Sequence, residues 1–194
     1  MRNSNTYMKI FRALEFAAER HKHQFRKGEV KVPYINHPIN VVTLLSKFNE
    51  TDQNLLTAAA LHDVIEDTAE GRKEIDDISK VIKNQFGSKV LDIVLEVSDD
   101  KSLPYQERKQ LQIKNTPSLS FEGKKLKISD KICNINDMMR YPPSNWSKER
   151  KVTYLEWAKQ VIEGARGVNT AMENHFDNVI QKAYNSLTNK ADYE

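Results

Sequence analysis

Four ionisable residues follow directly after an apolar run in the stretch AAALHDVIEDT, residues 58–68. The apolar run is suited to burial, and burying a charge is costly unless the charge is paired or bound to a metal. On a helix, His62 and Glu66 are four residues apart and share a face, as do Asp63 and Asp67. The stretch therefore predicts either a solvated helix end or a site for a cation.

Two ligands hold a divalent metal poorly, so a metal site here needs further donors. His37 stands in PYINHP, directly before a proline that suits the first turn of a helix. Asp130 lies in an otherwise apolar helical pattern in LKISDKICNIND, where a carboxylate needs a partner. Adjacent His62 and Asp63 diverge by about 100° around a helix axis, but both can reach one ion from a helix end or bend. The four residues are candidate ligands of one metal ion.

The composition is that of an ordinary globular protein. Of 194 residues, 39% are hydrophobic and 29% are charged, and the net charge of +3 gives no support for nucleic-acid binding. The single cysteine, Cys133, excludes an internal disulfide and favours a reducing compartment. No signal peptide or membrane-spanning run is present, so a cytoplasmic location is expected.

The apolar spacing predicts one all-α domain, a helical bundle of about eight to ten helices. Apolar residues recur at intervals of three and four, as in Ile75, Ile78, Ile82 and Phe86, and glycine and proline are few. The segment from Ser88 to Ser98 is rich in valine and isoleucine, but its spacing favours helix over strand. Helices are expected at about 8–18, 38–48, 51–68, 75–86, 88–98, 104–115, 122–139, 147–164 and 169–188.

The order of the candidate ligands resembles that of the HD superfamily of metal-dependent phosphohydrolases. HQFRKGEVKVPYINHPINVVTLL, AAALHDVIEDT and LKISDKICNIND together resemble the hydrolase domain of the RelA/SpoT alarmone enzymes. MMRYPPSNWSKERKVTYLEWAKQVIEG resembles the stand-alone small alarmone hydrolases, metazoan SpoT homologues among them. The resemblance covers about residues 5–185. It implies one HD domain over residues 1–194, with no synthetase or regulatory domain.

The resemblance implies a guanosine 3′,5′-bis(diphosphate) 3′-pyrophosphohydrolase, an enzyme of the stringent response. Such an enzyme releases pyrophosphate from a small-molecule substrate and leaves GDP, or GTP from the pentaphosphate. It implies one Mn²⁺ per chain, held by His37, His62, Asp63 and Asp130. Two imidazoles and two carboxylates suit Mn²⁺, although Zn²⁺ and Fe²⁺ accept the same ligand types.

The family resemblance also assigns a catalytic role to Glu66 and Asp67, one helical turn beyond the ligands. Water would attack the phosphorus next to the ribose 3′-oxygen. The two carboxylates would orient or deprotonate that water and handle the proton of the leaving group.

A strongly anionic nucleotide needs cationic and stacking groups around the metal. Arg26 and Lys27 match the pair that the family uses around the base, and a guanidinium can both stack and bind phosphate. Asn134 shares a helix face with Asp130 and matches a ribose or phosphate contact. The remaining candidate phosphate contacts are Lys101, Arg150 and Tyr154.

Two other functions stay open. One is an HD phosphohydrolase for another nucleotide, such as an NADPH ribose-phosphatase, because the loop GEVKVPY departs from the commoner SGEPY next to the base. The other is a module that binds the alarmone or a partner without turnover. The presence of every ligand together with Glu66 and Asp67 argues against the second. The oligomeric state is not determined by the sequence.

Overall fold

The computed structural model describes residues 2–188, which form ten α-helices and one short 3-10 helix, with no strand longer than an isolated bridge. The expected all-α fold is confirmed. None of the helices in this part of the chain is long and apolar enough to cross a membrane. The helices are α1 (Arg2–Arg20), α2 (Asn36–Lys47), α3 (Gln53–Leu61), α4 (Val64–Thr68), α5 (Gly71–Phe86), α6 (Ser88–Val97), α7 (Tyr105–Asn115), η1 (Thr116–Ser118), α8 (Phe121–Arg140), α9 (Lys148–Glu163) and α10 (Thr170–Thr188).

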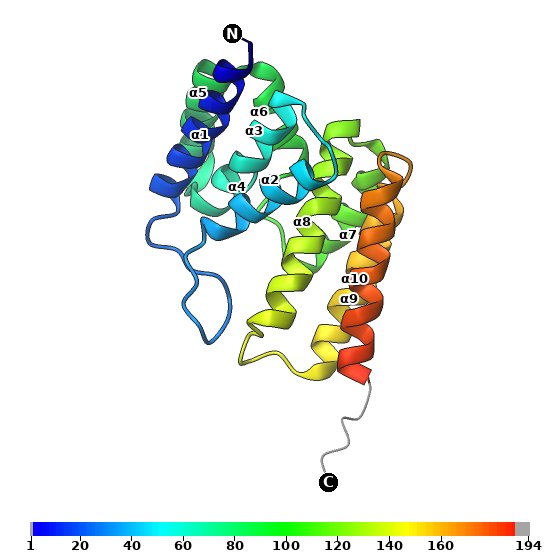
Figure 1. Ribbon diagram of the computed structural model, residues 1–194. Helices are drawn as coiled ribbons and strands as arrows, with labels where there is room; N and C mark the ends of the chain where they lie inside the picture. Colours follow the sequence, from blue (N-terminus) through cyan, green and yellow to red (C-terminus); the bar gives the residue numbers. More distant parts are fainter. Residues whose placement is uncertain (1, 189–194) are drawn as a thin grey trace.

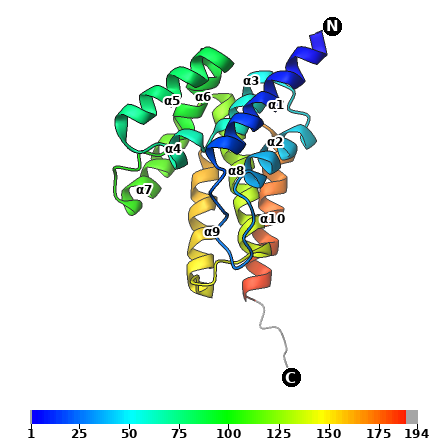
Figure 2. The same ribbon diagram turned by 90° about the vertical axis from the view of Figure 1, so that its left-hand side faces the viewer.

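Two helices organise the bundle. Helix α3 packs against α1, α2, α6 and α8, and α8 in turn packs against α2, α9 and α10. In Figure 1, α8, α9 and α10 run side by side in one half of the molecule, and α1, α3, α5 and α6 gather in the other. Figure 2 shows the same division from the side. The two halves meet where α2 and α3 contact α8.

Helix α3 is buried from Leu55 to Leu61, where all residues but Thr57 are apolar. The Asp52 side chain caps its first turn by accepting a hydrogen bond of 2.7 Å from the Leu55 amide. Ala58, Ala59 and Ala60 are fully buried, and their small side chains let neighbouring helices approach closely. The charged residues that follow are therefore carried to the centre of the molecule.

The prediction of one helix over 51–68 is wrong. Helix α3 ends at Leu61 and α4 begins at Val64, and a turn at His62 and Asp63 separates them. The His62 Nδ1 atom lies 2.9 Å from the Ala59 carbonyl oxygen and donates to it, so the imidazole helps to satisfy the end of α3. Asp63 has φ −92° and ψ −8°, values typical of a turn. The break directs both side chains to one place, which a straight helix would not do.

The segment between α1 and α2 is shaped by its own backbone. Phe25 and Pro33 form an isolated antiparallel bridge, and the Arg26 amide donates to the Val32 carbonyl at 2.9 Å. Helix α2 begins at Asn36, so His37 lies in its first turn rather than in the loop before it. The other expected helices are confirmed, including α6 in the segment that could have been a strand, but α1 and α5 begin earlier than expected, at Arg2 and Gly71.

Candidate metal centre and active site

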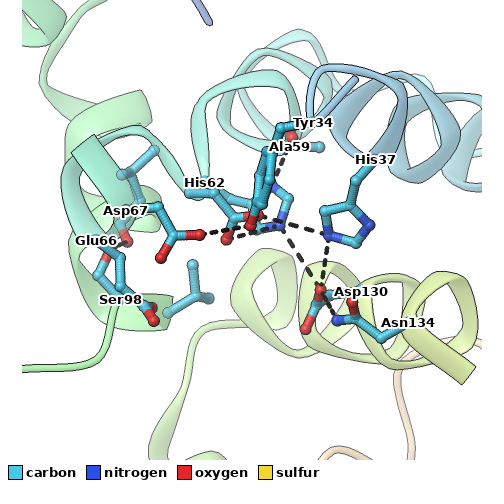
Figure 3. Close-up of polar contacts among 12 residues, drawn as sticks. Tyr34, His37, Ala59, His62, Glu66, Asp67, Ser98, Asp130 and Asn134 are labelled. Carbon is cyan, nitrogen blue, oxygen red and sulfur yellow. Dashed lines mark hydrogen bonds and ion pairs between the residues drawn. The ribbon is translucent and has the colours of Figure 1, made fainter. Parts of the chain in front are cut away.

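Two imidazoles and a carboxylate converge where α2, α3 and α8 meet (Figure 3). His37 comes from the first turn of α2, His62 follows α3, and Asp130 lies in the middle of α8. One ligand atom of each lies within 4.8 Å of the other two. Asp130 Oδ1 is 3.1 Å from His37 Nε2 and 3.7 Å from His62 Nε2. Nitrogen and oxygen donors this close together suit one divalent ion.

Asp63 lies beside the two imidazoles but is held differently. Its carboxylate oxygens are 3.2 Å from His62 Nε2 and 3.6 Å from His37 Nε2. The group of ligand atoms within 4.8 Å of one another contains His37, His62 and Asp130 but not Asp63. The Asp63 Oδ2 atom accepts a hydrogen bond of 2.8 Å from the Tyr34 hydroxyl. Three of the four expected ligands are thus grouped, and the fourth is in contact with two of them.

The hydrogen bonding of His62 leaves a nitrogen free for a metal. Because Nδ1 donates to the Ala59 carbonyl, the neutral imidazole carries its lone pair on Nε2. That Nε2 atom is buried and has no hydrogen-bond partner. An orphaned, buried imidazole nitrogen aimed at two carboxylates fits a metal ligand whose second nitrogen is fixed by the backbone.

The charges of the site also favour a bound cation. Burial disfavours the charged form of His62, but Asp63 and Asp130 outweigh burial and raise the pKa of His62 to about 9. Burial lowers the pKa of His37. Burial also opposes ionisation of Asp130, yet the Lys131 ammonium and the imidazoles hold the pKa of Asp130 well below its usual range. The carboxylates thus attract positive charge to this point, and a dication can replace the proton on His62.

The acidic pair lies one turn further along, on α4. The Glu66 Oε2 atom accepts a hydrogen bond of 2.9 Å from the Asp99 amide, and Asp67 accepts from the Lys101 ammonium at 2.5 Å. The Tyr34 hydroxyl is 2.5 Å from Asp67 Oδ2. Burial, with the negative charges of Asp63 and Asp99, raises the pKa of Glu66 to about 7. Glu66 can therefore gain or lose a proton near neutral pH.

Arg26 is linked to the metal ligands through Asn134. Its guanidinium donates to Asp137 Oδ2 at 2.9 Å and to Asn134 Oδ1 at 2.5 Å. The Asn134 amide donates in turn to Asp130 Oδ1 at 2.6 Å. The guanidinium carbon lies 5.2 Å from the centre of the Tyr34 ring. The loop cation is thus held in one orientation beside the candidate ligands.

A cavity of about 570 Å³ connects these groups, and it is large enough for part of a nucleotide. It is lined by every predicted site residue except one: His37, His62, Asp63, Asp130, Glu66, Asp67, Arg26, Lys27, Asn134, Lys101 and Tyr154.

The exception is Arg150. It lies on an adjoining groove between α7 and α9, where its guanidinium is 4.6 Å from the centre of the Trp146 ring. Tyr154 and Trp157 line both the cavity and the groove, so the two hollows are adjacent.

Comparison with known proteins identifies the family. A family model described as HD domain matches residues 13–159. The chain belongs to the HD-domain family. A Xenopus tropicalis protein named guanosine-3′,5′-bis(diphosphate) 3′-pyrophosphohydrolase MESH1 is 43% identical over 171 residues, covering 88% of this HD protein and 92% of the relative. The human protein of the same name is 41% identical over 165 residues, covering 84% and 88%.

A solved structure of a similar HD protein has the same fold. It is that of a metazoan ortholog of SpoT, described as hydrolysing ppGpp and acting in starvation responses. The TM-score is 0.82 at 40% sequence identity, covering 90% of this chain and 94% of that one. The resemblance expected from the motifs is confirmed.

Sequence reasoning did not single out three residues that contact the candidate site residues: Tyr34, Lys131 and Asp137. Lys131 is buried, with its ammonium 2.9 Å from Asp130 Oδ2 and 4.9 Å from the centre of the Trp157 ring. A lysine on the apolar face of an expected helix was a signal that could have identified it. Tyr34 and Asp137 carried no such signal, because their partners are far away in the sequence.

Proposed function

We propose that this HD protein is a metal-dependent 3′-pyrophosphohydrolase of guanosine 3′,5′-bis(diphosphate), with GDP or GTP and pyrophosphate as products. The observation that carries the proposal is the convergence of His37, His62 and Asp130, with Asp63 in contact, on a cavity that also contains Glu66 and Asp67. Relatives that match most of the chain are named for this reaction.

His37, His62, Asp63 and Asp130 would hold the metal in this proposal. When bound, a divalent cation supplies Lewis acidity, which lowers the pKa of water and offsets phosphate charge. The mixed nitrogen and oxygen donors support Mn²⁺ as the ion.

Glu66 and Asp67 would handle the protons of the reaction. Water adds to the phosphorus that carries the 3′-oxygen, the bond from that phosphorus to the 3′-oxygen breaks, and the 3′-oxygen takes up a proton as pyrophosphate is released. In the metal-free protein, burial and the neighbouring carboxylates raise the pKa of Glu66 to about 7, which favours Glu66 as the group that accepts or returns one of these protons. Asp67, held by Tyr34 and Lys101, would orient the attacking water.

The cavity also offers the cations that a polyphosphate requires. Arg26 and Lys27 would bind the base, and Asn134 would bind the ribose or a phosphate. Lys101, Tyr154 and, at the outer end of the groove, Arg150 would take phosphate oxygens. Further cations of the cavity wall are Arg108, Lys109, Lys127 and Lys131.

We place the enzyme in the cytoplasm and treat residues 1–194 as one hydrolase domain. The free, buried Cys133 supports a reducing compartment. The core that runs from α1 to α10 supports a single domain.

The decisive experiment is product analysis by anion exchange. The purified protein would be incubated with Mn²⁺ and guanosine 3′,5′-bis(diphosphate), and separately with NADPH and plain nucleotides. His62→Ala with Asp63→Ala is the test variant. His23→Ala with Asp92→Ala is the matched control, since both residues are exposed and lie outside the cavity.

Formation of GDP and pyrophosphate by the wild type and the control, but not by the test variant, is the expected result. Turnover of NADPH alone would be consistent with the proposed metal-dependent hydrolysis but would contradict the proposed substrate. No turnover of any nucleotide by folded, metal-loaded protein would favour a binding module.

A further inference from the structure

The Tyr34 hydroxyl lies between two carboxylates of the active site (Figure 3). It is 2.8 Å from Asp63 Oδ2 and 2.5 Å from Asp67 Oδ2. Asp63 is a candidate metal ligand, and Asp67 belongs to the acidic pair. A phenol has one proton and can donate to one carboxylate at a time. One hydroxyl proton is therefore shared between two groups that have different tasks, and both lie within hydrogen-bond distance of it.

The position of the Tyr34 ring is set independently of these carboxylates. The His21 ring stacks on it, with centres 4.6 Å apart and planes tilted by 18°. The Tyr34 amide donates to the Gln24 carbonyl at 3.0 Å. The Arg26 guanidinium, 5.2 Å from the ring centre, adds a further contact. The Tyr34 ring thus has packing and hydrogen-bond partners besides the two carboxylates that its hydroxyl contacts.

The loop that carries Tyr34 also holds the main chain of Asp67. The Gln24 side-chain amide donates to the Asp67 carbonyl at 2.7 Å, and its oxygen lies 2.6 Å from His21 Nδ1. Asp67 is therefore held at its backbone and at its carboxylate by one short segment.

The second side chain bound to Asp67 differs in burial. Lys101 also contacts this carboxylate, but its side chain is 47% exposed. An exposed ammonium is hydrated and mobile, so it cannot set the carboxylate position as a packed ring can.

We infer that Tyr34 is a positioning residue, whose hydroxyl holds Asp63 and Asp67 so that the metal and the acidic pair act on the same phosphorus. The inference deepens the proposed function and depends on it for its kinetic test. Tyr34 does not itself exchange a proton with the substrate. Its contribution is to the geometry of the two carboxylates.

The test is Tyr34→Phe, which removes one oxygen and keeps the ring and its stacking on His21. We expect kcat for guanosine 3′,5′-bis(diphosphate) to fall by about 10- to 100-fold, the usual effect of losing an outer partner of a metal ligand. KM should change by less than about threefold, because the hydroxyl faces carboxylates rather than substrate. Mn²⁺ affinity, measured by calorimetry, should fall by about tenfold. Tyr184→Phe on α10, outside the cavity, is the matched control.

A double-mutant cycle separates positioning from a general structural role. In an Asp67→Asn background, Tyr34→Phe should reduce kcat by a smaller factor than it does in the wild-type background, because one of the two carboxylates that it positions is already altered. A full, additive loss in that background would overturn the inference, as would wild-type kcat and Mn²⁺ affinity in Tyr34→Phe. If the wild type does not hydrolyse the alarmone, the proposed function fails. The Mn²⁺ titration of Tyr34→Phe against the wild type then still decides whether Tyr34 positions Asp63.

Discussion

The metal side and the substrate side of the cavity are built in different ways. His37 and His62 are 1% and 5% exposed and lie in or directly after helices of the core, so their positions follow from the packing of α2, α3 and α8. Lys101, in contrast, has a side chain that is 47% exposed, and it is paired with Asp67 and Glu66 rather than left free for a ligand. Buried ionisable groups need their partners to be present. Exposed ionisable groups contribute less to stability through their ion pairs, and they can change partners when substrate binds.

The largest effect is expected from Asp130→Asn on the metal side. This substitution removes the charge that both imidazoles and Lys131 face. We expect kcat/KM to fall by about a thousandfold or more, since a metal ion supplies several kcal/mol of transition-state stabilisation. The rise in Tm that Mn²⁺ produces in the wild type should also be lost. Asp92→Asn on the exposed face of α6 is the control, and a Mn²⁺-dependent rise in Tm in Asp130→Asn would contradict the assignment.

Glu66→Gln tests the acidic pair and should have the next largest effect. The amide keeps an acceptor for the Asp99 amide but cannot exchange a proton. We expect kcat to fall by about 100-fold or more with little change in KM. Wild-type kcat in this variant would remove Glu66 from the proton chemistry.

The same substitution has a pH-dependent effect on the stability of the metal-free protein. The Glu66 carboxyl has a pKa of about 7 in the fold against an ordinary value of 4.5, so the fold retains a proton that the unfolded chain releases between these pH values. Stability therefore falls as the pH rises from about 4.5 to about 7. The free energy of unfolding of Glu66→Gln should exceed that of the wild type by ~1–3 kcal/mol at pH 8, and the two should be equal near pH 4.5. Urea unfolding with a chelator at both pH values measures this, and equal differences at both would contradict it.

Arg26→Lys tests the substrate side of the cavity. An ammonium cannot keep both hydrogen bonds of the guanidinium, to Asp137 and Asn134, and its position over Tyr34. We expect KM to rise by about tenfold and kcat to change by less than about threefold. Lys31→Arg, on the same loop but outside the cavity, is the control. A fall in kcat without a change in KM would place Arg26 with the catalytic groups instead.

The smallest effect is expected from Arg150→Ala. Arg150 is exposed and lies on the outer groove beside Trp146. An exposed charge of this kind contributes about 0.2–1 kcal/mol, so KM should rise by about fivefold at most. Initial rates at low and high salt measure this contribution, which should shrink as salt rises. A loss as large as that of Arg26→Lys would remove the distinction between the cavity and the groove.

The sequence by itself determined the helices, because apolar residues at intervals of three and four must be buried together. It also offered candidate metal ligands: His37, His62, Asp63 and Asp130 are ionisable groups in otherwise apolar or helix-starting segments, and their order resembles that of the HD superfamily. These are local properties of the chain, and propensity and periodicity report them directly.

Only the tertiary structure decided how those residues meet. At the break between α3 and α4, the His62 side chain donates a hydrogen bond to the Ala59 carbonyl. The periodicity of apolar residues does not predict such a bond. Tyr34 reaches Asp63 and Asp67 across about thirty residues, and Arg26 reaches Asp137 across 111. Such contacts arise when separate helices pack, and a distance between segments is not encoded in the local pattern of either one. The chain thus specifies the groups, and the packing of α2, α3 and α8 makes them a site.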